Sequence, residues 1–267
     1  RNLWPALAER AGIELDRTGA LAVGPDDWLD GVAASLTALD GRPMDIGGGT
    51  ARALAPGLSD TFARALLSRE DWRVDAPVAL AALRNTAEAA GVQFRPWRVS
   101  SRGNADVLVV ATGASADLEL APELAGLAPI KGHIVRVARP AVGAVVRSRG
   151  IYAAPGEAMA FGATMEPGLG DDAVDPTKAE PLLAAGLQLF PGLAGTPATF
   201  AAGVRAATSD GLPMVGPSAE PAVVLAVGPR RNGWLLAPLV AQIVTAFVTG
   251  RDPGPYAGRF DPKRFRA

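Results

Sequence analysis

The chain has 267 residues, of which 49% are apolar and 20% are charged, so it is long and apolar enough to build a substantial buried core. Its 26 Lys and Arg residues nearly balance 27 Asp and Glu residues, so it has no basic field that would bind nucleic acid through the phosphates. The absence of cysteine excludes disulfides, thiolate nucleophiles and cysteinyl cofactor links, and the single histidine, His133, argues against a histidine metal cluster or a Ser-His-Asp triad.

The first part of the chain predicts two helices and one short strand. Apolar residues recur at helical spacing over 2–11, and a second helix is predicted over 26–39, after a glycine-bounded strand at 19–24. The three glycines at 47–49 are interpreted as a flexible turn and not as a phosphate-binding loop. The reasons are that no strand is predicted before them and no Gly-Lys-Ser/Thr follows.

The remainder of the chain predicts alternating helices and strands. In chain order these are a helix over 74–91, a brief strand at 92–94, a strand within 106–114, strands at 134–137 and 142–146, a hairpin of 151–155 with 159–165, a helix over 181–190 and a strand over 223–228. Four consecutive apolar residues within 106–114 predict a strand that is buried on both faces, as in a parallel sheet. The apolar run 234–248 is too short to cross a bilayer and predicts a buried helix.

Two kinds of architecture are interleaved along the chain. Strands followed by helices predict an α/β domain, whereas the hairpins between them predict a separate antiparallel sheet. The chain is therefore expected to form two discontinuous domains. One comprises residues 1–15, 73–128 and 201–267, and the other comprises residues 16–72 and 129–200.

The C-terminal third carries the most specific motifs. Residues 203–216 read Gly-Val-Arg-Ala-Ala-Thr-Ser-Asp-Gly-Leu-Pro-Met-Val-Gly, and residues 231–238 read Arg-Asn-Gly-Trp-Leu-Leu-Ala-Pro. Together they resemble the Gly-Leu-Arg-Pro…Thr-x-Asp-Gly-x-Pro-x-x-Gly segment and the Arg-Asn-Gly turn of the D-amino acid oxidase family. Further segments are similar to the glycine oxidase branch of that family: Tyr152–Pro155, Phe161–Gly168, Pro129–Gly132 and Val74–Asp75.

The resemblance implies a glutathione-reductase-type FAD-binding domain, formed by the first set of ranges, and an antiparallel substrate-binding domain, formed by the second. It implies FAD-dependent oxidation of glycine, a D-amino acid or another small amine to an imine and then a keto acid, with O2 as electron acceptor. FAD would supply the redox chemistry, which suits a chain with one histidine. The protein is expected in the cytoplasm, without a membrane span, and assembly as a homo-oligomer is left open.

Two other functions stay open at this point. One is a dehydrogenase of the same fold that passes electrons to a quinone or another acceptor. The other is a cofactor-free remnant with a binding or structural role.

Three residues are implied by the resemblance to form the catalytic site. Arg205 would bind the substrate carboxylate with its guanidinium fork, and Tyr152 would direct its hydroxyl at the same group. Met165, expected on the strand that pairs with the Tyr152 strand, would wall the substrate cavity. The alternatives are a structural ion pair for Arg205 and core packing for Tyr152 and Met165.

The cofactor contacts are implied by the same resemblance. The turn before the last helix would face the flavin with Arg231, Asn232, Gly233, Trp234 and Leu235. The other candidates are Thr112 and Gly113, which follow the 106–114 strand, and Gly203. His133 is expected to support a strand, and Asp210 is expected to stabilise a turn and not to act as a base.

The sequence departs from the family pattern in three places. No Gly-x-Gly-x-x-Gly turn is present, Pro229 stands where relatives often have histidine, and the 100–105 link is short where a β-meander is usual. The chain opens at Arg1, so a preceding segment that carries the missing dinucleotide-binding motif is expected. Without it, FAD is expected to bind weakly or not at all, and an apolar sheet edge or cleft is expected to lie uncovered.

Overall fold

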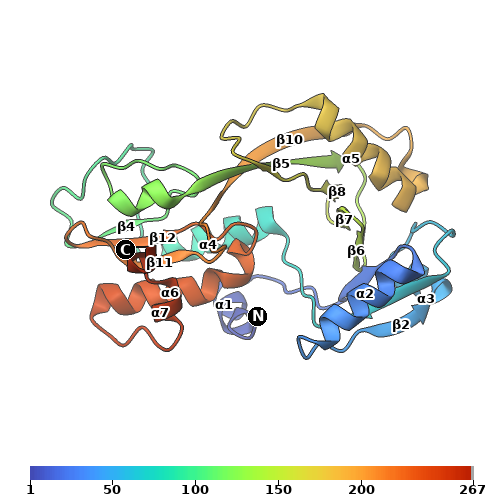
Figure 1. Cartoon of the computed structure of the whole chain (residues 1–267), viewed down its shortest axis with the longest axis horizontal. Helices are drawn as coiled ribbons and strands as arrows, with labels where there is room; N and C mark the ends of the chain where they lie inside the picture. The colour runs from blue at the N-terminus through green and yellow to red at the C-terminus, as the bar shows by residue number, and fades with distance from the viewer. Residues whose placement is uncertain (266–267) are drawn as a thin grey trace.

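The computed structural model describes residues 1–265 as two β-sheets with helices packed against them (Figure 1). The larger sheet is antiparallel except for the parallel pair β1–β6. Its strands lie in the spatial order β10 (Ala198–Ala207), β5 (Ala128–Val137), β8 (Met159–Gly162), β7 (Ile151–Ala154), β6 (Val145–Ser148), β1 (Ala20–Ala22), β3 (Arg64–Ser68) and β2 (Met44–Gly47), with the short β9 (Glu166–Pro167) paired to β5.

The smaller sheet lies at the other end of the molecule (Figure 1). It consists of β11 (Met214–Pro217), β12 (Val223–Val227) and β4 (Leu108–Val110), and β12 and β4 are parallel. The long helix α6 (Gly233–Thr249) packs against β11 and β12. Strands β5 and β10 extend from the region of this sheet into the larger one, so the boundary expected between residues 200 and 201 falls inside β10.

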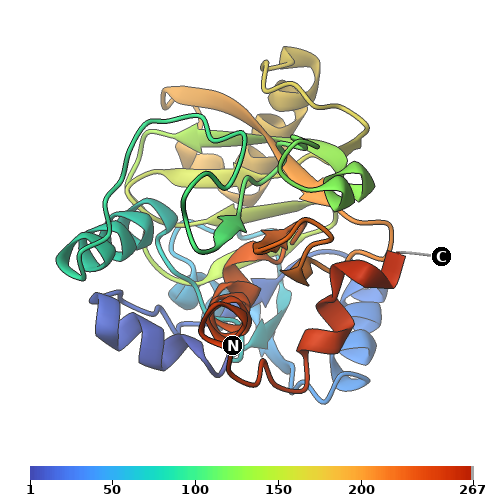
Figure 2. The ribbon, with the colours of Figure 1, turned by 90° about the vertical axis from the view of Figure 1, so that its left-hand side faces the viewer.

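The remaining helices lie around the two sheets. They are α1 (Trp4–Ala11), α2 (Asp26–Thr37), α3 (Gly48–Leu54), α4 (Ala76–Ala89), α5 (Pro176–Leu189) and α7 (Ala257–Phe260), together with the 3₁₀ turns η1 (Pro122–Gly126), η2 (Pro191–Leu193) and η3 (Pro262–Phe265). Helices α1 and α4 lie side by side (Figure 2), and α5 packs against β5, β7 and β8. Among residues 1–265, no helix is both long and apolar enough to cross a membrane.

Strand β5 shows how the larger sheet divides its side chains between two faces, because successive side chains point to opposite sides. The core face of β5 carries four buried residues: Lys131, His133, Val135 and Val137. The other face, which we call the arginine face, carries Ile130, Gly132, Ile134 and Arg136. Since α5 and the largest apolar cluster cover the core face, the arginine face is the side of the sheet that remains for a ligand.

Two strand predictions are wrong. Residues 92–94 form no strand, and Val92 and Phe94 are about half exposed. The strand predicted within 106–114 to be buried on both faces is the three-residue β4, in which the side chain of Val109 is 40% exposed. Among residues 1–265, β4 pairs only with β12, so one of its edges has no neighbouring strand to extend the ladder.

The turn predicted at 47–49 is also wrong, because β2 ends at Gly47 and α3 begins at Gly48. A Cβ atom at Gly48 would overlap the carbonyl oxygen of Phe62, so close packing against the neighbouring backbone explains this glycine.

The helix predicted over 181–190 begins earlier, at Pro176. Its N-cap is Asp175, whose carboxylate accepts a hydrogen bond from the backbone N–H of Thr177 at 2.9 Å.

Other predictions are confirmed. Strand β1 precedes α2, the hairpin β7–β8 pairs residues 152–154 with 160–162, and buried strand β12 leads into α6. Asp210 stabilises a turn, since its carboxylate accepts hydrogen bonds from the Thr208 hydroxyl and the Leu212 backbone N–H. An ion pair with Arg264 at 2.8 Å holds the pKa of Asp210 well below its ordinary value.

Candidate active site

The pairing of four strands brings Arg205 and Tyr152 onto the arginine face. Arg205 on β10 stands opposite Ile130 on β5, and Tyr152 on β7 stands opposite Gly162 on β8, which in turn faces Ile134. Residues that pair directly across an antiparallel ladder point to the same side. The two side chains therefore lie on one surface, although they are 53 positions apart in the sequence.

Two glycines form the floor beneath these side chains. A Cβ atom at Gly132 would overlap the guanidinium of Arg205, and one at Gly162 would overlap the phenol of Tyr152. Each long side chain thus lies flat over the neighbouring strand and occupies the place of a missing side chain. The guanidinium of Arg205 therefore lies over β5 and the phenol of Tyr152 lies over the adjacent β8, so the two polar groups approach each other from opposite sides.

Electrostatics favour the neutral phenol of Tyr152. Burial raises the pKa of this phenol, and the positive charges of Arg205 and Arg136 oppose the rise without cancelling it. Tyr152 therefore remains a hydrogen-bond donor across the physiological pH range. A donor beside a guanidinium fork is the arrangement that binds a carboxylate.

The loop after β8 holds Arg205 from below. Its guanidinium Nη1 lies 3.5 Å from the carbonyl oxygen of Thr164, at the outer limit of a hydrogen bond. The Thr164 hydroxyl accepts the backbone N–H of His133 at 2.8 Å and donates to the Glu166 carboxylate at 2.6 Å. Glu166 accepts hydrogen bonds from Thr164 and from His133, which keep its pKa below the ordinary value, and the bond from Thr164 has the larger effect.

The fully buried His133 is structural. Its Nε2 atom accepts the backbone N–H of Asp175 at 3.0 Å, so the proton of the neutral ring is on Nδ1, which donates to Glu166 at 2.9 Å. Both ring nitrogens are thereby occupied on the core face. As expected from the sequence, His133 supports the strand.

Met165 does not lie on the strand that pairs with the Tyr152 strand, because β8 ends at Gly162. It follows Thr164 in the loop, and its side chain is 40% exposed. Strand β8 ends at Gly162 because its residues pair with both β5 and β7 only up to that position. The apolar pattern of residues 159–165 does not indicate this end.

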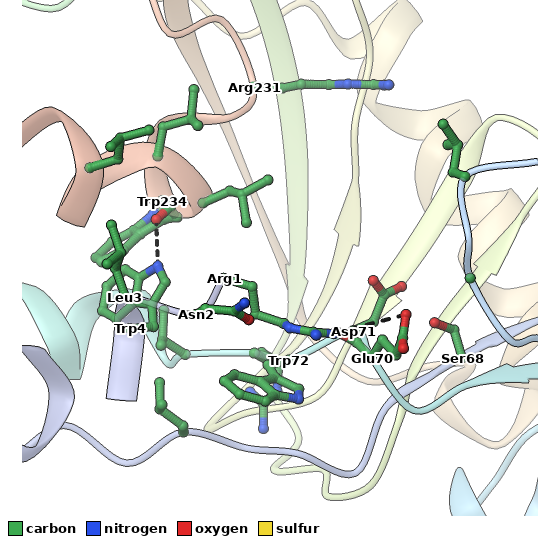
Figure 3. A pocket seen from close by; sticks show the side chains of 18 of the residues that line it. Arg1, Asn2, Leu3, Trp4, Ser68, Glu70, Asp71, Trp72, Arg231 and Trp234 are labelled. Atoms are coloured by element: carbon green, nitrogen blue, oxygen red, sulfur yellow. Dashed lines mark hydrogen bonds and ion pairs between the residues drawn. The ribbon is translucent and has the colours of Figure 1, made fainter. Parts of the chain in front are cut away.

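A cavity of about 1190 Å³ lies beside this surface (Figure 3). Three indoles, Trp4, Trp72 and Trp234, contribute to its walls, and the side chain of Arg231 extends across it from the N-terminal end of α6. Trp4 fixes one wall by donating its ring N–H to the carbonyl oxygen of Trp234 at 2.8 Å. Leu235 also lines the cavity.

Two contacts place this cavity next to the Arg205–Tyr152 pair. The backbone N–H of Arg230 donates to the carbonyl oxygen of Ala206 at 2.9 Å, which fixes the Arg231 turn against the end of β10. On the other side, Arg147 stands opposite Tyr152 in the ladder and also lines the cavity, where it pairs with Asp71 at 3.2 Å. The cavity lining itself includes neither Arg205 nor Tyr152.

The other predicted cofactor residues lie elsewhere. Gly203 belongs to the arginine face, opposite Gly132, and Gly233 lines a separate apolar groove. Thr112 and Gly113 follow β4, where the Thr112 hydroxyl donates to the Ser115 carbonyl at 3.0 Å and Gly113 has a positive φ of 63°. Asn232 precedes α6 and makes no side-chain cap. These five residues do not line the large cavity.

The separate groove lies between the smaller sheet and α6. Its volume is about 320 Å³, and the residues that line it are apolar or glycine, including Val109, Ala226 and Val240. Leu235 and Val248 of α6 are also about half exposed, so the helix is less buried than its sequence predicted. An apolar groove therefore lies uncovered between the smaller sheet and α6.

The large cavity suits one end of a flavin dinucleotide. Its walls combine the three indoles with five arginines and two carboxylates, so aromatic surface and excess positive charge meet in one place: Arg1, Arg42, Arg73, Arg147, Arg231, Glu70 and Asp71. A planar ring system with attached phosphates matches that combination. The glycine-rich junction between β2 and α3, Gly47–Gly49, does not line this cavity, and Gly48 packs against the carbonyl oxygen of Phe62.

Sequence reasoning did not identify Arg136, Thr164 or Arg147. Thr164 contacts Arg205, Arg147 stands opposite Tyr152, and Arg136 lies on the same face. One signal could have identified Arg136. Arg136 lies between the apolar residues Val135 and Val137 of the core face, and an arginine that interrupts an apolar strand in this way points to a functional face.

Comparison with known proteins agrees with these features. Residues 1–247 match the DAO family, described as FAD dependent oxidoreductase. The bifunctional protein ThiO/ThiG of Trichormus variabilis is 32% identical over 69% of this chain and 28% of its own length. The glycine oxidase of Pseudomonas putida is 34% identical over 57% of this chain and 45% of its own length. The chain thus spans less than half the length of these two relatives.

Solved structures agree as well. The crystal structure of glycine oxidase from Geobacillus kaustophilus superposes on the whole chain with a TM-score of 0.82 and 26% identity, and the alignment covers 81% of that protein. This confirms the predicted mixed α/β fold class and the family resemblance of the motifs. The chain therefore belongs to the DAO family of FAD-dependent oxidoreductases.

Proposed function

We propose that the protein oxidises a small amino acid at its α-carbon, with FAD as cofactor and O2 as electron acceptor. The observation that carries this proposal is the convergence of the Arg205 guanidinium and the Tyr152 phenol above a glycine floor, beside an aromatic, cationic cavity. Glycine oxidases are among the similar proteins, and that name supports the same class of substrate.

The residues of this chain would bind and orient the substrate. Arg205 would take the substrate carboxylate with two parallel charge-assisted hydrogen bonds, and Tyr152 would donate a third. With the carboxylate fixed, the α-carbon and the amine point away from the sheet toward the cavity that Arg231 spans. When bound, FAD supplies the two-electron chemistry that no side chain here provides. No protein base of shifted pKa is needed if the amine binds in its neutral form.

Oxidation assays with saturating FAD would test this proposal. Glycine and small D-amino acids should consume O2 and release ammonia and the matching keto acid. A decisive comparison measures O2 uptake against reduction of an artificial dye under the same conditions. Dye reduction without O2 uptake would reassign the protein as a dehydrogenase, and no turnover of any amine with either acceptor would overturn the proposal.

The 267-residue chain by itself is expected to bind FAD weakly or not at all. In a dinucleotide-binding domain a Gly-x-Gly-x-x-Gly turn brings the free backbone N–H groups of a helix N-terminus to the pyrophosphate, and residues 1–265 contain no such turn. Titration of the purified chain, followed by flavin fluorescence and absorbance, would measure this. Tight stoichiometric binding would show that the cavity arginines hold the phosphates unaided. A chain preceded by a Gly-x-Gly-x-x-Gly segment is the matched comparison.

Replacing Tyr152 with phenylalanine should lower kcat/KM for amino acids by about three- to tenfold, because it removes one hydrogen bond to a charged group. Since the pKa of Tyr152 is raised, the phenol stays protonated and the loss should be constant between about pH 7 and pH 9. Simple amines without a carboxylate should show no loss. An equal loss on both substrate types would mean that Tyr152 supports the fold instead.

A further inference from the structure

Arg136 lies on the arginine face, one step further along β5 than the pair that binds the carboxylate in our proposal. It stands between Ala160 of β8 and Thr199 of β10 in the ladder, and it is exposed. Ile134 lies two residues earlier on the same face. It pairs across the sheet with Gly162, which in turn pairs with Tyr152. The guanidinium of Arg205, the phenol of Tyr152 and the side chain of Arg136 therefore follow one another along this surface.

Unlike Arg147 and Arg64 of the larger sheet, Arg136 has no anionic partner among residues 1–265. Arg147 pairs with Asp71 at 3.2 Å, and Arg64 pairs with three aspartates within 3.4 Å. Within residues 1–265, neither Arg136 nor Arg205 makes an ion pair, and the carbonyl oxygen of Thr164 is the single hydrogen-bond partner of the Arg205 side chain. Two uncompensated positive charges thus share one face with Tyr152, and both act on its phenol electrostatically.

Small residues make up most of the surface between the two arginines. The two rows that separate Arg205 from Arg136 contain Gly132 paired with Gly203, and Ile134 paired with Ala201 and Gly162, and the phenol of Tyr152 lies over Gly162. At Gly203 no atom lies within 4 Å of the place a Cβ would take, so the space above it is open. Gly132 and Arg136 are four positions apart on one strand, or about 13 Å. That span accommodates two guanidinium groups with a short dianion between them.

We propose that Arg136 is a specificity-determining residue that binds a second carboxylate of the substrate, so that the preferred substrates are amino acids bearing two carboxylates. This inference rests on the proposed function, in which Arg205 takes the α-carboxylate. The second carboxylate, on the side chain or on a carboxymethyl group attached to the nitrogen, would lie against Arg136. A dianion would also relieve the repulsion between the two unpaired cations on this face.

Substrate pairs that differ only in charge would test the role of Arg136. With saturating FAD, D-glutamate should be oxidised with a higher kcat/KM than D-glutamine, and N-(carboxymethyl)glycine with a higher kcat/KM than its monoamide. In at least one pair the preference should be about tenfold, the order expected for one partly exposed charge-assisted contact. Arg136→Met should abolish this preference and leave the amide unchanged. Arg251→Met, which removes an exposed, unpaired arginine at the end of α6, is the matched control and should change neither rate.

A binding measurement separates this inference from the proposed oxidation. Arg205, Tyr152 and Arg136 all belong to the larger sheet. Calorimetric titration with glutarate and with its monoamide therefore needs neither turnover nor flavin. Glutarate should bind about tenfold more tightly, and Arg136→Met should remove the difference. Equal binding of both compounds, or a preference that persists in Arg136→Met, would overturn the role of Arg136. Loss of all amine oxidation with the binding preference intact would overturn the proposed function instead.

Discussion

Replacing Arg205 with methionine is expected to lower kcat/KM for amino acid substrates by about 100-fold or more, while the fold is retained. A bidentate, charge-assisted contact to a carboxylate is among the strongest polar interactions in proteins, and methionine keeps much of the side-chain volume without it. A factor of 100 corresponds to about 2.7 kcal/mol of lost transition-state binding. Steady-state kinetics with saturating FAD would measure the loss, and circular dichroism would check the fold.

The controls for this variant follow from its position. Within residues 1–265, Arg205 makes no ion pair and its side chain contacts the Thr164 carbonyl at 3.5 Å, so its removal should cost little stability. Turnover of simple amines that lack a carboxylate should fall much less than turnover of amino acids. An unchanged kcat/KM on every active amino acid would refute the assignment of Arg205 to the carboxylate.

Replacing Gly132 with alanine should have the second largest effect, although alanine adds only one carbon. That carbon would overlap the Arg205 guanidinium and would lie 2.7 Å from the Thr164 carbonyl oxygen, so both must move. The arginine can swing away easily because it is the far end of a flexible side chain, but it then leaves the position above β5. We expect KM for amino acids to rise by about ten- to 100-fold, because the charge-assisted contact is weakened or lost.

Gly49→Ala provides the matched control for this substitution. Gly49 lies in helix α3, and no atom is within 4 Å of the place its Cβ would take, so alanine should be tolerated and should leave KM unchanged. If Gly132→Ala binds amino acids as tightly as the unmodified protein, the glycine floor is not needed to position Arg205. If it loses activity on simple amines equally, the substitution has disturbed the sheet and not the carboxylate site.

Local sequence signals determined a large part of the secondary structure. The alanine- and leucine-rich run of α4, the hairpin β7–β8 and the buried strand β12 were predictable because periodicity and turn residues act over a few neighbouring positions. The same signals misled at residues 92–94, where Val92 and Phe94 alternate with Gln93 but pair with no strand. Strand length depends on a partner, and for that reason β4 is shorter than its apolar sequence suggests.

The sequence by itself determined the family, through the motifs at 203–216 and 231–238, and with the family the roles expected of Arg205 and Tyr152. Only the tertiary structure decided how these residues are supported. Gly132 of β5 lies beneath Arg205 of β10, 73 positions later in the chain, because these two strands pair in one particular register. The same register places Arg136 on the face that Arg205 occupies. The large cavity likewise joins Trp4 and Trp72 to Trp234. Periodicity assigns each side chain to one face of its own strand, but contacts between faces arise from long-range pairing, which no local pattern in one sequence specifies.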